Sequence, residues 1–173
     1  MARDFDDNEF PLAYLISFRC YGTWLHGDDR GSVDRKHNVY GTSKIAPNSA
    51  LRKSDLKQLK YPPQQLDARK RQVVEKAVRE VCDQRKYLLR AISVRTNHVH
   101  TVVSAARKPE PILIAFQAYS TRALRREGLI PSGVKPWSRH GSTPYLWKQR
   151  DVEKAMEYVL LGQGDELFRL DDD

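Results

Sequence analysis

The chain has 173 residues and a mass of 20.0 kDa, which is enough for one domain with a hydrophobic core and short for two. Its 30 Lys and Arg residues exceed its 22 Asp and Glu residues and give a net charge of +8, which favours a polyanion as partner. No apolar run approaches the roughly 20 residues of a transmembrane helix, no secretory signal is visible, and the two cysteines form no C-x-x-C pair. These features argue against a membrane protein, a disulfide scaffold and a cysteine zinc site, and they predict one cytoplasmic domain over residues 1–173.

The positive charge is concentrated in the middle of the chain. Residues 1–10 carry a net charge of −3 and residues 165–173 carry −4, so residues 11–164 must carry +15. We expect the two acidic ends to be solvated tails. The basic body between them is the part that we expect to contact phosphates.

The first predicted element is a strand. The β-prone run over 13–21 begins after Pro11 and stops at Gly22. The basic segment that follows, about 22–66, contains several glycines and prolines and shows no sustained hydrophobic period. We expect a long loop here with a short helix around 54–59, and a connection of this length suggests a function or local disorder.

The middle of the chain predicts two helices around two strands. Asp67 is a candidate N-cap, and apolar residues at helical spacing predict a helix that runs to about residue 85. Two strand-like runs follow, at 87–96 and 98–105. The segment 112–127 then has the pattern of a second helix, which Gly128 closes.

The last third of the chain adds a short strand-like run at 137–147 and a final helix that starts near Asp151 and ends at Gly162. No internal repeat and no low-complexity tract is present. The order of the elements predicts an α+β fold, in which a single domain has a mostly antiparallel central sheet flanked by helices.

Two of the five histidines are paired. His98 and His100 stand two residues apart in the predicted strand, so both imidazoles lie on one face, where they could bind one ion or bond to buried neighbours. The chain lacks the cysteines of a structural zinc site, the third histidine of histidine-triad hydrolases and the two His-x-Thr/Ser units of two-histidine phosphoesterases. What remains is an open site with a third, oxygen ligand from elsewhere, which suits Mg²⁺ or Mn²⁺ acting on a phosphate.

The stretch Arg95-Thr-Asn-His-Val-His-Thr-Val-Val103 resembles the Asn-His-Val-His signature of the single-tyrosine HUH transposases, which include the REP-associated tyrosine transposases of bacteria. In that family the nucleophilic tyrosine lies downstream on a C-terminal helix, after a segment that ends in Trp-Gln or similar. Here Tyr145-Leu-Trp-Lys-Gln-Arg150 precedes a helix that carries Tyr158. The resemblance implies a ferredoxin-like (RRM-like) HUH fold, and it is weakest over the loop at 22–66.

The resemblance implies that Tyr158 is the nucleophile, and Tyr119 on the preceding helix is its competitor. Tyr158 lies about 130° from the centre of the apolar stripe of its helix, where a purely structural tyrosine is less common. That stripe consists of Val152, Ala155, Met156, Val159 and Leu160. Tyr119 follows Phe116 by three residues, a helical spacing that predicts a side chain facing the core. We therefore favour Tyr158 as the nucleophile.

The resemblance also implies three metal ligands: His98, His100 and a Gln or Asn four residues after the tyrosine. Gly162 occupies that last position and has no side chain, and the nearest amide is Gln163. A break of the helix at Gly162 could turn Gln163 toward the histidines. Gln163 is therefore the candidate third ligand, and inactivity through a lost ligand is the alternative.

The family implies metal-dependent cleavage and strand transfer of single-stranded or hairpin DNA through a 5′-phosphotyrosine, with Mg²⁺ or Mn²⁺ as cofactor. The candidate DNA contacts are Arg122, Arg125, Arg126, Lys135, Arg139, Lys148, Trp24 and Trp137. Two other functions stay open: a catalytically inactive protein that binds single-stranded or hairpin nucleic acid, and an RNA-processing metallonuclease. The family includes monomers and dimers, so a homodimer also stays open.

Overall fold

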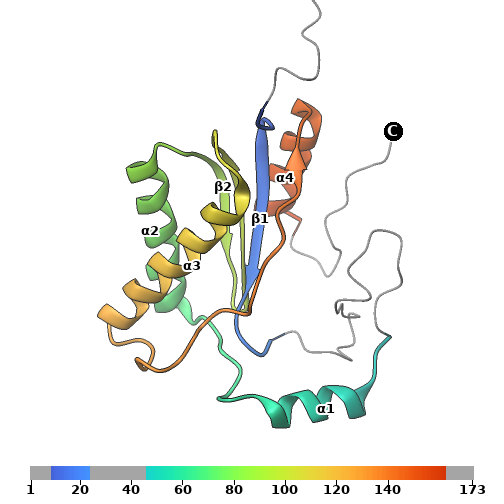
Figure 1. Cartoon of the computed structure of the whole chain (residues 1–173), viewed down its shortest axis with the longest axis vertical. Coiled ribbons are helices and arrows are strands. Elements are labelled where there is room, and N and C mark those ends of the chain that lie inside the picture. The colour runs from blue at the N-terminus through green and yellow to red at the C-terminus, as the bar shows by residue number, and fades with distance from the viewer. Residues whose placement is uncertain (1–8, 24–45, 163–173) are drawn as a thin grey trace, which may run out of the picture.

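A four-stranded antiparallel sheet runs through the centre of the protein, with two helices on one side and the last helix on the other, while the first helix lies apart from the sheet (Figure 1). The structure, a computed structural model, describes residues 9–23 and 46–162. Its elements in chain order are β1 (Ala13–Arg19), α1 (Ser49–Gln58), α2 (Ala68–Arg85), β2 (Leu88–Val94), β3 (His98–Ser104), α3 (Pro109–Arg126), β4 (Tyr145–Leu146) and α4 (Gln149–Leu160). No helix among the described residues is long and apolar enough to cross a membrane.

The strand order is β2-β3-β1-β4, and every neighbouring pair is antiparallel. A β-α-β-β-α-β chain with α2 and α3 as its two helices and this order of strands is a ferredoxin-like fold, to which α4 is added after the last strand. The predicted α+β fold, with a mostly antiparallel central sheet flanked by helices, is therefore confirmed.

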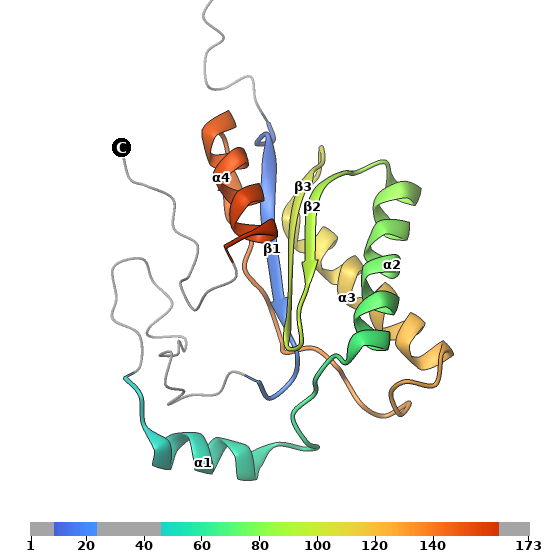
Figure 2. The same cartoon turned by 180° about the vertical axis from the view of Figure 1, so that it is seen from behind.

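Alternation along β1 gives the sheet two faces with different partners, because successive side chains of a strand point to opposite sides. Tyr14, Ile16 and Phe18 point to one side, where α2 and α3 pack around the larger hydrophobic core. Ala13 and Leu15 belong to a smaller core on the other side, under α4. Figures 1 and 2 show α2 and α3 on one side of the sheet and α4 on the other.

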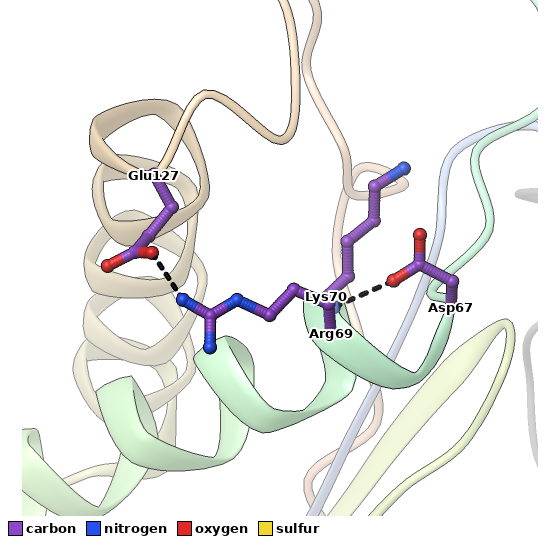
Figure 3. Close-up of polar contacts among 4 residues, drawn as sticks. All are labelled: Asp67, Arg69, Lys70 and Glu127. Atoms are coloured by element: carbon purple, nitrogen blue, oxygen red, sulfur yellow. Dashed lines mark hydrogen bonds and ion pairs between the residues drawn. The ribbon is translucent and has the colours of Figure 1, made fainter.

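The α2–α3 layer forms largely as its sequence predicts. Asp67 caps α2 by accepting a hydrogen bond from the backbone N–H of Lys70 at 2.9 Å. All six residues of the predicted stripe are buried: Val73, Val74, Ala77, Val78, Val81 and Cys82. An ion pair of 2.7 Å between Arg69 and Glu127 joins the start of α2 to the end of α3 (Figure 3). Both side chains are exposed, so this pair contributes about 1 kcal/mol at most.

The hairpin of β2 and β3 places the paired histidines. Both strands are slightly shorter than predicted. Val99, Thr101 and Val103 are fully buried, and the two valines belong to the core under α2 and α3. By alternation, His98 and His100 lie on the opposite face, which carries α4.

The long loop predicted over 22–66 contains a helix that begins earlier than expected. α1 starts at Ser49 rather than near residue 54, and Asn48 caps it by accepting hydrogen bonds from two backbone N–H groups. None of its residues is buried. A helix without an apolar stripe has no hydrophobic period, which is why sequence patterning placed it poorly. Residues 24–45 of the predicted loop lie outside the described residues.

The strand-like run predicted at 137–147 pairs with β1 only in part. It forms the two-residue strand β4 and two isolated bridges, one of which joins Trp137 to Cys20. Between them, Gly141 lies against β1, and a Cβ at this position would be 2.5 Å from the Ser17 carbonyl oxygen. The close approach of this segment therefore requires a glycine.

α4 begins two residues before the predicted start and ends at Leu160 rather than at Gly162. Three residues of the predicted stripe are fully buried against the sheet: Val152, Ala155 and Val159. Leu160, which was also predicted in the stripe, is 54% exposed. The helix contacts the sheet along a narrower strip than its sequence suggests.

Candidate active site

The two histidines of β3 lie side by side on the α4 face of the sheet. Their ring centroids are 4.7 Å apart, with an angle of 62° between the ring planes. His100 is 7% exposed, while His98 is half-buried. The same-face geometry expected from the H-x-H spacing is present in the folded chain.

His100 is held by the neighbouring strand and is neutral at pH 7. The Ser17 hydroxyl lies 2.5 Å from its Nδ1 atom, at the position that faces it in β1. Burial first, and then the charges of His98, Arg19 and Arg95, lower the pKa of His100 to about 3. A proton on Nδ1, donated to Ser17, leaves a lone pair on Nε2, which is the form of histidine that binds metals.

His98 has an equivalent arrangement with its sequence neighbour. The Asn97 carbonyl oxygen Oδ1 lies 2.6 Å from His98 Nδ1. Because a carbonyl oxygen only accepts, Nδ1 carries a proton in this arrangement, and the neutral ring would present its lone pair at Nε2. A partner on one ring nitrogen that directs the other toward a metal is the usual arrangement around histidine ligands. The residues present therefore fit a metal bound by two imidazoles.

A metal site with two imidazoles needs a third ligand to match the predicted set. Among residues 9–23 and 46–162, no group of three His, Cys, Asp or Glu side chains could hold a metal ion. Gln163, the predicted third ligand, lies outside the described residues. The helix ends at Leu160, before Gly162, and the Gly162 N–H donates to the carbonyl oxygen of Tyr158 at 3.1 Å.

Tyr158 of α4 lies against His100. Their ring centroids are 5.3 Å apart, with an angle of 65° between the ring planes. The tyrosine is half-buried and packs at the margin of the smaller core. A phenol and two imidazoles from different elements therefore meet on the α4 face.

Tyr119, the competing tyrosine, belongs to the other face. It packs against the larger core, and its hydroxyl donates to Gln84 Oε1 at 3.4 Å. The guanidinium of Arg122 lies 4.5 Å from the centre of its ring. The sheet separates Tyr119 from the histidine pair, so of these two tyrosines only Tyr158 is next to it.

Sequence reasoning missed two serines beside His100. Ser17 in β1 and Ser93 in β2 are both register partners of His100, so the three side chains form a row across the sheet. We call this the serine row. The alternation of residues along β1 contains the signal, because Ser17 shares its face with Leu15 rather than with Phe18.

Sequence reasoning also missed two arginines beside His98. Arg19 is the register partner of His98 in β1. On the other side, the backbone N–H of Arg95 donates to the His98 carbonyl oxygen at 2.8 Å. We call these three residues the arginine row. The turn of only two residues between Arg95 and His98 would have indicated this pairing, had the two strands been read as one hairpin.

The predicted DNA-binding cations do not gather at this site. Arg122, Arg125 and Arg126 belong to α3, on the opposite face of the sheet. Lys148 is the N-cap residue of α4. Arg139 is closer, because the preceding residue, Ser138, donates its backbone N–H to the Arg19 carbonyl oxygen at 2.9 Å.

The remaining three predicted contacts are distributed differently. The side chain of Lys135 is exposed, and its backbone N–H donates to the Tyr61 hydroxyl at 2.8 Å. Trp137 is 8% exposed, packs edge-on against Phe18 and donates its indole N–H to a carbonyl oxygen of α3. The expectation that Trp137 stacks on bases is corrected, because its ring is part of the core. Trp24 lies outside the described residues.

Similarity to known proteins is found at the level of the fold. The sequence matches no protein-family model and no curated protein. The structure is similar to that of a REP-associated tyrosine transposase bound to a REP hairpin, with a TM-score of 0.49 and 10% sequence identity. The similarity covers 87% of this chain and 65% of that chain. The protein thus spans less than two thirds of the length of the transposase.

Proposed function

We propose that the protein cleaves and rejoins single-stranded DNA in a metal-dependent, transposase-like reaction with Tyr158 as nucleophile. The proposal rests on the packing of Tyr158 against His100 and of His100 against His98. It rests also on the position of His98 between Arg19 of β1 and Arg95, which follows β2. Phosphoryl transfer needs a nucleophile, a means of binding a metal and positive charge for the phosphate. Residues of these three kinds meet on the α4 face.

In the proposed reaction, the Tyr158 hydroxyl oxygen attacks the phosphorus of a DNA phosphodiester. A bond forms between this oxygen and phosphorus, and the bond from phosphorus to the 3′ oxygen breaks. The phenol gives up its proton and the departing 3′ oxygen takes one up, which leaves a 5′-phosphotyrosine and a free 3′-OH. Because the phosphodiester is conserved in the tyrosine ester, attack by a second 3′-OH rejoins the strand without an external energy source.

Mg²⁺ or Mn²⁺, held by His98, His100 and the proposed oxygen ligand Gln163, would supply Lewis-acid stabilisation of the phosphate charge. Neighbouring residues of the chain favour metal binding by the two imidazoles. Ser17 and Asn97 orient the two rings, and burial keeps His100 neutral. The basic body of the protein favours a nucleic acid as the substrate, since phosphate contacts supply much of the affinity for nucleic acid.

The experiment compares the wild-type protein with Tyr158→Phe, which removes the attacking oxygen and keeps the ring that packs on His100. A hairpin-tipped oligonucleotide labelled at its 3′ end is incubated with Mn²⁺ and separated by denaturing electrophoresis, because the fragment joined to tyrosine carries that end. We expect a covalent adduct from the wild type. We expect Tyr158→Phe to bind the oligonucleotide and to form no adduct.

Tyr119→Phe is the matched control, since it removes one hydroxyl from the other face of the sheet and should leave adduct formation intact. An adduct that persists in Tyr158→Phe and disappears in Tyr119→Phe would assign the nucleophile to Tyr119. Binding without an adduct in wild type, with both Mg²⁺ and Mn²⁺, would instead support a binding protein that has lost its third ligand at Gly162. Cleavage of RNA alone would support the RNA-processing alternative.

A further inference from the structure

The arginine row crosses the sheet next to the serine row that holds His100. Arg19 and Arg95 come from segments far apart in the chain, yet each pairs with His98 through the backbone. The hairpin turn sets the position of Arg95 beside His98, and the register between β1 and β3 sets the position of Arg19. His98, one of the two proposed metal-binding histidines, therefore lies between two guanidinium-bearing residues.

Both arginines belong to the face of the histidines. Arg19 lies two residues after Ser17 and so shares its side of β1. Arg95 donates from Nε to Ser93 Oγ at 3.0 Å, which directs its side chain along the row that contains His100. The face that carries the two imidazoles therefore also carries two arginines, whose guanidinium groups suit an anion.

We propose, on the basis of the function proposed above, that Arg19 and Arg95 bind the phosphodiester backbone of the substrate strand from opposite sides of His98. Adjacent strands lie about 4.8 Å apart, so the backbones of the two arginines are separated by roughly 10 Å, and their long side chains can reach a phosphate between them. A guanidinium offers five N–H donors in a planar fork that matches two oxygens of a phosphate.

This placement has a consequence for catalysis. A phosphate held over His98 lies on the side of the sheet where Tyr158 packs on His100. The arginines would therefore position the scissile phosphate between the nucleophile and the imidazoles, a contribution of orientation rather than of bond making. Contacts from arginine need no metal, so they can be measured when the metal is removed.

The experiment measures binding in the Tyr158→Phe protein, which cannot form an adduct, in buffer with EDTA. Affinity for the hairpin-tipped oligonucleotide is recorded by fluorescence anisotropy over a series of salt concentrations, with and without Arg19→Gln, Arg95→Gln or both. We expect each substitution to weaken binding roughly 10-fold. The slope of log affinity against log salt should become less negative by about 0.7 for each arginine, the value for one phosphate contact to a single strand.

Arg79→Gln is the charge-matched control, because Arg79 is an exposed residue of α2 that pairs with Glu75 on its own helix. It should change affinity less than about twofold. Arg95 is exposed and follows the last residue of β2, so Arg95→Gln tests the proposal even where a substitution at the half-buried Arg19 impairs folding. A salt slope in Arg95→Gln equal to that of Arg79→Gln would overturn the proposal.

The salt-slope experiment and the adduct experiment test the two proposals separately. Adduct formation by the wild type with unchanged salt slopes in the arginine variants would leave the function standing and overturn the arginine row as a phosphate site. Reduced slopes in the arginine variants, with no adduct from the wild type, would support the phosphate site in a protein that binds without cleaving. Failure of the wild type to bind any oligonucleotide would overturn both.

Discussion

The two faces of the central sheet differ in whether their residues stay apolar along the whole length of β1. On the α2–α3 face, β1 presents Tyr14, Ile16 and Phe18, all buried, from one end to the other. On the α4 face, the same strand begins with apolar residues under the helix and ends with Ser17 and Arg19. The first face is uniform, and the second changes from a packed end to a polar end.

This difference shows how one small sheet can serve both stability and chemistry. Burying a polar group is unfavourable, and the neutral, buried state of His100 reflects that penalty. The larger core on the opposite face can offset it, because each strand contributes to both sides. Polar residues on an otherwise apolar face of a sheet are therefore expected at functional sites. The comparison predicts that substitutions on the two faces will affect different measurements.

The largest effect on stability is expected from a substitution in the larger core, on the α2–α3 face of the sheet. Phe116 of α3 is fully buried in the larger core, and Phe116→Ala should destabilise the protein by about 3–5 kcal/mol, as measured by urea denaturation. Ile114→Ala on the same helix is the control, because Ile114 is 64% exposed and its loss should change stability by about 0.5 kcal/mol or less. Equal effects of the two substitutions would contradict the assignment of the core to this face.

Alkaline pH should lower the stability of the protein through the two buried cysteines of the larger core, Cys20 and Cys82. Burial raises the pKa of Cys20 from 9.0 to about 12 and that of Cys82 from 9.0 to about 11. Above pH 9 the unfolded chain loses thiol protons that the folded chain retains, so stability should fall as pH rises. The loss should approach about 1.4 kcal/mol per pH unit for each thiol until its folded pKa is reached.

Urea denaturation between pH 8 and pH 10.5 measures this effect. The variant with both Cys20→Ala and Cys82→Ala should lose less stability over the same range, because it has no thiol to ionise on unfolding. The same pH dependence in wild type and double variant would show that other groups are responsible.

The polar end of the α4 face should show a smaller and different response. Ser17→Ala removes the hydroxyl that orients His100, and we expect Mn²⁺ affinity and adduct formation to fall about 10-fold, the lower end of the range for partners of metal-binding histidines. Stability should change by about 1 kcal/mol or less. Ser138→Ala is the control, because the Ser138 hydroxyl donates to a backbone carbonyl oxygen instead. Equal Mn²⁺ affinity in the two variants would exclude a positioning role for Ser17.

Much of the fold was predictable because its signals are local. The stripe of α2, its cap at Asp67 and the alternation around His98 and His100 were all visible as sequence periods. α1 was placed poorly because it buries no residue, and the run that ends in β4 was predicted too long because its pairing depends on contacts with β1. The site was predictable only in part: Tyr158 was expected beside the histidines, while the serine and arginine rows were not.

The sequence by itself determined which residues share a face within one element, because helical and strand periods are properties of consecutive residues. It therefore determined the histidine pair and the off-stripe position of Tyr158. Only the tertiary structure decided that Tyr119 and Arg122 lie across the sheet from the histidines, and that Arg19 lies beside His98. The physical reason is that strand register and helix placement depend on packing between distant segments, and no local period encodes that packing.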